Sequence, residues 1–228
     1  MATPKITLYL DVVSPFGYLA YYVLRHSPIF RPCEIEYVPV FLGGLMKACN
    51  NTPPLEITNK NKWISRERLR WASLFNIPIT RTLPPNFPPL TLQVQRVLTA
   101  LQLCSPSSLP TAFDALYHCY FVEGNPDINN PSTFGPVLEK ALGKELAVKV
   151  MEDGKEDNAK NKLKENTDRA FVGGAFGMPW FECVNSKGET EGFWGFDHLG
   201  QVARFLELNG QGGGKVETGL VEGMKAML

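Results

Sequence analysis

Strand-forming patterns occur only near the two ends of this 228-residue chain, and this distribution limits the folds that it can adopt. Residues 5–12 and 34–40 alternate between apolar and polar side chains, which predicts two strands. Residues 16–26 between them are apolar on nearly all sides and predict a buried helix. Strand, helix and strand within so short a distance form a βαβ unit with a right-handed crossover.

The second group of strand patterns lies near the C-terminus. Residues 180–184 and 192–194 flank the turn-forming sequence Asn-Ser-Lys-Gly at 185–188, which predicts a hairpin. Asp197 then has the character of a helix cap, and the helix after it is expected to reach Leu208 and to end at Asn209-Gly210.

The stretch between these two groups has helical spacing and no strand pattern of comparable quality. The order β-α-β, helices, β-β-α therefore predicts an α/β fold with a mixed sheet, built from residues 1–58 and 173–228, into which an all-helical domain of residues 59–172 is inserted. Helices within the insertion are expected over residues 63–75, 92–101, 112–120, 136–142, 146–151 and 157–171.

Composition excludes several classes of function. Lysine plus arginine equals aspartate plus glutamate at 23 each, so no net basic field favours nucleic acid or an anionic membrane. No apolar run approaches the roughly 18–20 residues of a membrane span. The five cysteines form no C-x-x-C pair or metal-binding spacing, which argues against a disulfide scaffold and a metal site.

These cysteines and the absence of a leader pattern before the first strand indicate a cytoplasmic, intracellular protein. The mitochondrion and the peroxisome stay open as alternatives. The C-terminal sequence Lys225-Ala226-Met227-Leu228 lacks the basic middle residue of a peroxisomal Ser-Lys-Leu signal.

Two X-Pro segments combine features of structure and of chemistry. Ser14-Pro15 has the character of a helix start, with serine as cap and proline as first residue. The same geometry offers unpaired N–H groups, a positive dipole end and a hydroxyl to a thiolate. Met178-Pro179 is either a simple kink at a strand start or an edge whose backbone pairs with a peptide-like ligand.

Four segments resemble the kappa-class glutathione transferases and the related 2-hydroxychromene-2-carboxylate isomerases. Residues 11–16 match the pattern D-x-x-S-P-[FY], and residues 174–179 match G-A-F-G-x-P. Residues 51–54 match N-x-P-P, and residues 195–197 match G-x-D. The resemblance covers nearly the whole chain and implies a thioredoxin-like fold with a DsbA-like helical insertion.

The resemblance also implies a glutathione site without a metal. It assigns the catalytic hydroxyl to Ser14, makes the bond before Pro179 cis, and makes the protein a homodimer. It places the pocket for a small apolar electrophile in the helical insertion. The residues that it assigns to glutathione are Ser14, Pro15, Phe16, Asn51, Met178, Pro179, Phe196 and Asp197.

The free energy needed to lower the pKa of a thiol can be compared with what a helix start and a hydroxyl supply. Free thiols titrate near 8.5, and lowering that pKa by ~2 units requires ~2.7 kcal/mol of anion stabilisation. A helix dipole supplies ~0.3–1 kcal/mol and a hydrogen bond to a charged sulfur ~1.5–3 kcal/mol. The dipole alone falls short, whereas the dipole together with the Ser14 hydroxyl suffices. Because serine stands where a redox relative has cysteine, dithiol–disulfide exchange is excluded at this turn.

Three functions stay open on the sequence alone. The first is a glutathione transferase, and the second is a glutathione-dependent isomerase that activates the same thiol. The third is a non-catalytic binding protein, which Phe196 favours because the kappa family often has serine at that position.

Overall fold

The computed structural model describes residues 2–208, and its centre is one four-stranded sheet with the order β2-β1-β3-β4. The strands are β1 (Lys5–Leu10), β2 (Glu34–Pro39), β3 (Trp180–Val184) and β4 (Thr190–Trp194). β1 pairs in parallel with β2 and antiparallel with β3, and β3 pairs antiparallel with β4. The mixed sheet and the order β-α-β, helices, β-β expected from the sequence are confirmed. The last helix was expected to reach Leu208 but ends at Phe205. The expected closing pair Asn209-Gly210 and the terminal residues 225–228 lie outside the described residues.

The two faces of β1 contribute to two apolar clusters. Ile6, Leu8 and Leu10 are fully buried in a large core that includes helix α1 (Pro15–His26). Tyr9 points to the opposite face, where it packs in a smaller cluster with residues of α8 (Asp157–Val172) and β3. This alternation is the strand periodicity read from the sequence.

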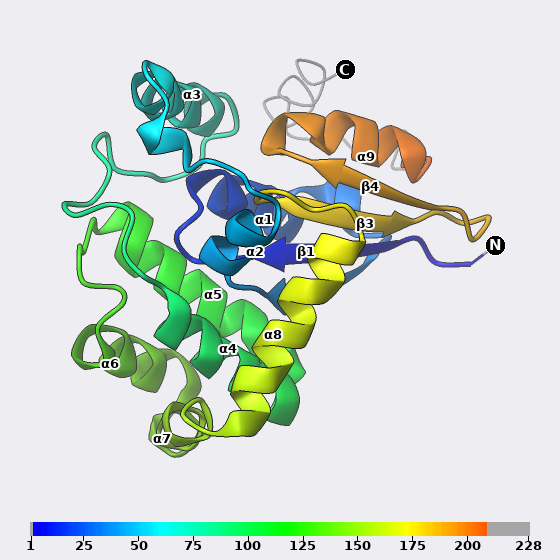
Figure 1. Cartoon of the computed structure of the whole chain (residues 1–228). Helices are drawn as coiled ribbons and strands as arrows, with labels where there is room; N and C mark the ends of the chain where they lie inside the picture. Colours follow the sequence, from blue (N-terminus) through cyan, green and yellow to red (C-terminus); the bar gives the residue numbers. More distant parts are fainter. Residues whose placement is uncertain (1, 209–228) are drawn as a thin grey trace.

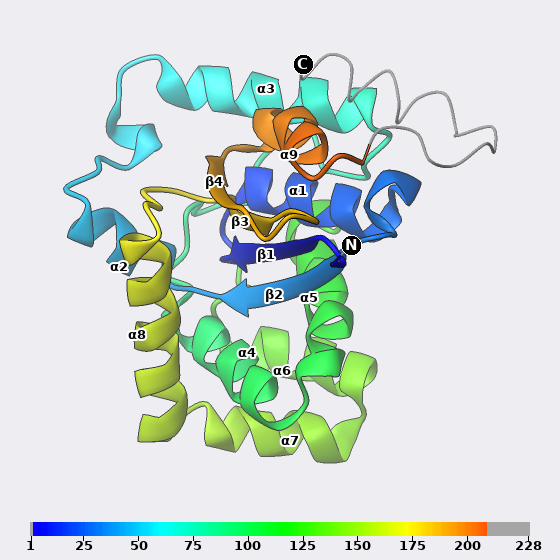
Figure 2. The same cartoon turned by 90° about the vertical axis from the view of Figure 1, so that its right-hand side faces the viewer.

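The helices divide around the sheet. In Figures 1 and 2, α3 (Lys60–Leu74) and α9 (Leu199–Phe205) lie near β4, whereas the group from α4 to α7 lies beyond β2. Among the helices of the segment 59–172, α3 packs against α1, whereas α4 packs against β2 and α8. The remaining helices are α2 (Leu42–Ala48), α4 (Leu92–Cys104), α5 (Leu109–Tyr117), α6 (Pro131–Leu142) and α7 (Lys144–Asp153). Short 3-10 turns cover Pro28–Phe30, Pro54–Glu56, Pro106–Ser108 and Phe196–His198. A π-helical turn covers His118–Val122.

Several predicted boundaries were wrong for local reasons. β1 ends at Leu10 rather than at residue 12, because the Asp11 carbonyl accepts the Ser14 N–H (3.0 Å) and closes a turn. α6 begins at Pro131 rather than at Pro136, because the Asn130 side chain accepts the Ser132 N–H and caps the helix. The short α2 was not predicted from the sequence.

The predicted capping role of Asp197 was also wrong. Asp197 lies inside the 3-10 turn Phe196–His198, whose cap residue is Gly195, and α9 begins only at Leu199. Gly195 has a φ of 96°, a left-handed conformation that glycine adopts readily. A turn that glycine can form therefore replaces the expected side-chain cap.

An aromatic contact fixes α3 over the 3-10 turn. The Phe196 ring is 1% exposed and lies 5.5 Å from the Trp71 ring and 5.3 Å from the Phe75 ring, in edge-on geometry. Such contacts add to the stabilisation from burial. The hydrophobic docking of α3 therefore depends on the Phe196 ring.

We expect Phe196→Ala to lower the free energy of unfolding by about 3–5 kcal/mol, because it leaves a cavity between α3 and the sheet. Phe176→Ala is the matched control, since the Phe176 ring is 41% exposed and packs only on the surface against Trp194, and its loss should cost about 1 kcal/mol. Urea unfolding measures both values. Equal losses in the two variants would contradict the buried docking role of Phe196.

Candidate functional site

The Ser14 hydroxyl joins the start of α1 to the cis-proline loop. It accepts the Gly17 N–H at 3.0 Å as the helix cap, and it donates to the Met178 carbonyl oxygen at 3.3 Å. A Cβ atom at Gly17 would lie 3.0 Å from the Ser14 Cβ, so glycine allows this close capping geometry. The cap and the candidate catalytic hydroxyl are therefore the same atom, and it points at residue 178.

The Met178-Pro179 segment lies between this hydroxyl and the sheet. The Met178-Pro179 peptide bond is cis, and β3 begins with the next residue, Trp180. The Pro179 carbonyl accepts the Gly195 N–H at 3.1 Å, which connects the segment to the 3-10 turn. Within residues 2–208 the Met178 N–H has no backbone hydrogen-bond partner, so it is free to pair with a ligand.

The loop after α2 is attached to the same segment. The Asn51 side-chain amide donates to the Phe176 carbonyl at 2.7 Å, and the Cys49 thiol donates to the Ala175 carbonyl at 3.3 Å. These bonds join residues more than a hundred positions apart. Asn51 is thus bonded to Phe176, which precedes Met178 by two residues, and the Met178 carbonyl accepts the Ser14 hydroxyl.

The remaining candidate residues differ in what they can offer. Pro15 is buried, and Phe16 is partly buried against the main core next to Ser14. The Phe196 side chain lies in the aromatic contact described above, so only its backbone can reach a ligand. Asp197 is exposed, and its Oδ1 atom lies 3.4 Å from the His198 Nδ1 atom. The structure thus joins Ser14 directly to Met178 and joins Asn51 to the same segment through the Phe176 carbonyl. Asp197 is connected to this segment through the turn that Gly195 anchors at Pro179.

Electrostatics at the start of α1 favour an anion. The first turn of this twelve-residue helix contains no acidic residue, while Arg25 and His26 lie in its last turn. The N–H groups of Gly17 and Tyr18 are already bonded to Ser14, so within residues 2–208 the Phe16 N–H and the positive dipole end are what this turn offers to an anion.

Asp11 is a buried carboxylate behind this turn, and the sequence analysis did not single it out as a site residue. Its side chain is fully buried; Oδ1 accepts the Val13 N–H at 3.1 Å and Oδ2 accepts the Leu42 N–H at 2.9 Å. Burial outweighs these hydrogen bonds and raises the pKa of Asp11 to about 6. The only signal in the sequence was its place as the acidic first residue of the motif at 11–16.

The groups that face Asp11 from the helical side are uncharged phenols. The Tyr117 hydroxyl donates to the Asp11 carbonyl at 3.4 Å, and burial raises the pKa of Tyr117. The Tyr120 hydroxyl is buried nearby without a hydrogen-bond partner among the described residues, and burial raises its pKa as well. Within residues 2–208 no cation lowers the pKa of this carboxylate to offset the effect of its burial.

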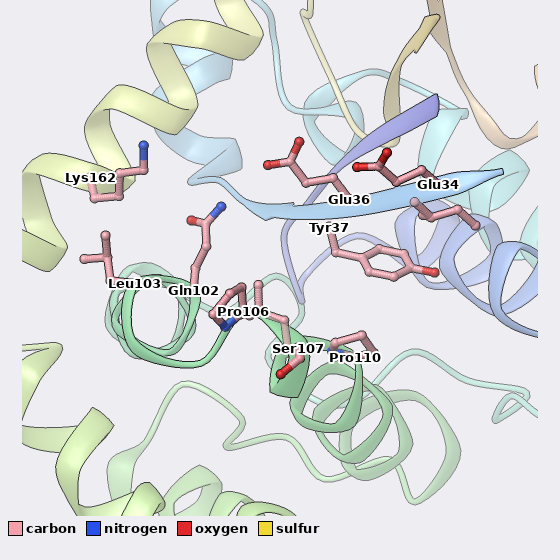
Figure 3. Close-up of a pocket in the computed structure, with 11 residues that line it drawn as sticks. Glu34, Glu36, Tyr37, Gln102, Leu103, Pro106, Ser107, Pro110 and Lys162 are labelled. Carbon is pink, nitrogen blue, oxygen red and sulfur yellow. The ribbon is translucent and has the colours of Figure 1, made fainter. Parts of the chain in front are cut away.

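The cavity drawn in Figure 3 is separate from this site. It has a volume of about 550 Å³ and lies between β2, α4 and α8, with Glu36, Gln102 and Lys162 in its wall. None of the candidate glutathione residues lines it. In the part of the chain that the structure describes, no group of three or more His, Cys, Asp or Glu residues is placed to hold a metal ion, and no helix is long and apolar enough to cross a membrane.

Comparison with known proteins places the chain among thioredoxin-like proteins. The model of the DSBA-like thioredoxin domain family matches residues 5–207. Glutathione S-transferase kappa 2 of Caenorhabditis elegans is 30% identical over 209 residues, covering 88% of this chain and 91% of that protein. Glutathione S-transferase kappa 1 of Homo sapiens is 29% identical, covering 88% and 90%. A solved 2-hydroxychromene-2-carboxylate isomerase superimposes with a TM-score of 0.72 at 21% identity, covering 89% of this chain and 94% of that one.

The buried Asp11 predicts an unusual dependence of stability on pH. Its pKa in the folded protein, about 6, lies above the ordinary value of 3.8, so the folded state holds the proton more tightly and stability falls as pH rises through this interval. Asp11→Asn cannot ionise. Between pH 4 and pH 7 the wild type should therefore lose up to about 3 kcal/mol of unfolding free energy relative to Asp11→Asn. Urea unfolding across this range measures the difference, and parallel curves would contradict the prediction.

Proposed function

The chain belongs to the DSBA-like thioredoxin domain family, on the branch of the kappa-class glutathione S-transferases, and from this premise we propose that it is a glutathione transferase in which Ser14 activates the thiol. The observation that carries the proposal is the 3.3 Å hydrogen bond from the Ser14 hydroxyl to the Met178 carbonyl. This bond joins the Ser14 hydroxyl, at the N-terminus of α1, to the backbone of the cis Met178-Pro179 segment.

Glutathione is proposed to lie along the Met178 backbone as a short added strand. The unpartnered Met178 N–H would donate to the cysteinyl carbonyl of glutathione, and the Met178 carbonyl would accept the cysteinyl N–H. The Ser14 hydroxyl then rotates from the Met178 carbonyl to the sulfur. Exchange of one acceptor for the other leaves no buried group without a partner.

The two ends of glutathione are assigned to the residues around this strand. The exposed carboxylate of Asp197 is suited to the α-ammonium of the glutamyl residue, and the backbone N–H groups of the turn at Phe196 to its carboxylate. Asn51, which is bonded to the Phe176 carbonyl, and Phe16, which follows Ser14 at the start of α1, are assigned to the wall of the site.

In the proposed reaction the thiolate attacks an apolar electrophile. The sulfur forms a bond to the electrophilic carbon, and either a leaving group departs with the bonding electron pair or a neighbouring carbon takes up a proton. Ser14 and the start of α1 stabilise the sulfur anion before the attack. The electrophile pocket is assigned to the helical segments beside Ser14, and a homodimer is expected for the whole protein.

We expect Ser14→Ala to raise the thiol pKa of bound glutathione by roughly 1–2 units, because the hydroxyl hydrogen bond to the sulfur is lost. Ultraviolet titration of the thiolate measures this value. Ser27→Ala is the matched control, since Ser27 is also a buried cap whose hydroxyl accepts a backbone N–H, from Ile29, at the other end of α1. Equal thiol pKa values in wild type and Ser14→Ala would remove Ser14 from the mechanism.

A glutathione-dependent isomerase is the second candidate, supported by the fold shared with the solved 2-hydroxychromene-2-carboxylate isomerase. There the thiolate adds to a conjugated substrate, the adduct rearranges, and elimination returns glutathione. Product analysis separates the two: stable glutathione adducts favour transfer, whereas free isomer and unconsumed glutathione favour isomerisation. Calorimetry addresses the third candidate, a non-catalytic protein, which would bind no glutathione even at millimolar concentration.

A further inference from the structure

We propose that Asp11 is a positioning residue that holds the Ser14 turn and the loop carrying Asn51 in one arrangement, and thereby sets both the affinity for glutathione and the acidity of its thiol. This inference rests on the proposed transferase function. Asp11 is not assigned to contact glutathione or the reacting atoms. It would act through the backbone N–H groups that it binds.

Asp11 holds the catalytic turn with two of its acceptors. Its Oδ1 atom accepts the Val13 N–H at 3.1 Å, and its main-chain carbonyl accepts the Ser14 N–H at 3.0 Å. Two consecutive N–H groups of the turn therefore bond to one residue. The direction of the Ser14 hydroxyl depends on this turn, because Ser14 is the first residue outside α1.

The second carboxylate oxygen of Asp11 holds the other wall of the site. Oδ2 accepts the Leu42 N–H at 2.9 Å, at the first residue of α2. α2 is only seven residues long, and the Asn51 N–H returns to the Met46 carbonyl at 2.9 Å just after it. Asn51 then donates to the Phe176 carbonyl, so Asp11 is connected through α2 to the loop that precedes Met178.

Asp11 lies among other buried polar groups. The carboxylate is fully buried, and the buried Thr91 side chain, just before α4, acts to lower the pKa of Asp11. Gln95, also fully buried, donates to the carbonyls of Leu10 and Val40 at the ends of β1 and β2. Removal of the carboxylate leaves the Val13 and Leu42 N–H groups without their acceptor, so the backbone must move, or admit water, to satisfy them.

Asp11→Asn tests the proposal because it preserves size but supplies one acceptor oxygen in place of two. We expect the KM for glutathione to rise about 10-fold and the thiol pKa of bound glutathione to rise measurably. Hydrogen exchange should accelerate at residues 12–14 and also at residues 42–51, in the absence of glutathione. Thr91→Val removes the hydroxyl that acts on the Asp11 carboxylate and should shift all three readouts in the same direction by smaller amounts.

Asp114→Asn is the matched control. Asp114 accepts hydrogen bonds from Tyr21 and Arg25 between α1 and α5, away from the Ser14 turn, so its loss should reduce stability while KM, thiol pKa and exchange at residues 42–51 stay as in the wild type. A purely structural Asp11 would behave in the same way, and that result would overturn the proposal.

The exchange measurement separates the two levels of inference. If the wild type binds no glutathione, the proposed function fails, while unchanged exchange at residues 42–51 in Asp11→Asn would overturn the positioning role independently. If Asp11→Asn does not fold, Thr91→Val decides, and wild-type values of KM, thiol pKa and exchange in that variant would overturn the proposal.

Discussion

The antiparallel pairing of β1 with β3 is the constraint on which the rest of the structure depends. Its register sets Tyr9 opposite Trp180, and the candidate site lies at this end of both strands. The Ser14 turn follows β1, and Met178-Pro179 precedes β3. Residues 164 positions apart in the chain thereby come within hydrogen-bond distance. A slip of one residue would turn the side chains of β1 to the opposite face and separate the two segments.

The site shows how one group can serve stability and chemistry together. The Ser14 hydroxyl caps α1 and points at the Met178 carbonyl, so the same contacts that start the helix also prepare an anion site. Asp11 is the costly part of this arrangement, because a fully buried carboxylate with a raised pKa destabilises the fold at neutral pH. In return, its two carboxylate oxygens satisfy the Val13 and Leu42 N–H groups, one in the Ser14 turn and one at the start of α2.

Parts of this arrangement could be predicted from the sequence because they depend on local patterns. The strands, most helices, the cap at Ser14 and the special place of Met178-Pro179 follow from periodicity and from the chemistry of serine and proline. Asp197 illustrates the limit of such patterns: it resembles a cap, but the 3-10 turn at Gly195 displaces it. α2 escaped prediction because it is short, contains two glycines and begins on a distant carboxylate, that of Asp11.

The sequence by itself determined the fold class, the family resemblance and the replacement of a redox cysteine by Ser14, because these depend on residue type and order. Only the tertiary structure decided which groups meet: the Ser14 hydroxyl with Met178, Asn51 with the loop before it, and Asp11 with Leu42. It also decided that Phe196 belongs to the core under α3. The physical reason is that burial and hydrogen-bond partners are set by strand register and helix docking, which bring together residues that no local pattern connects.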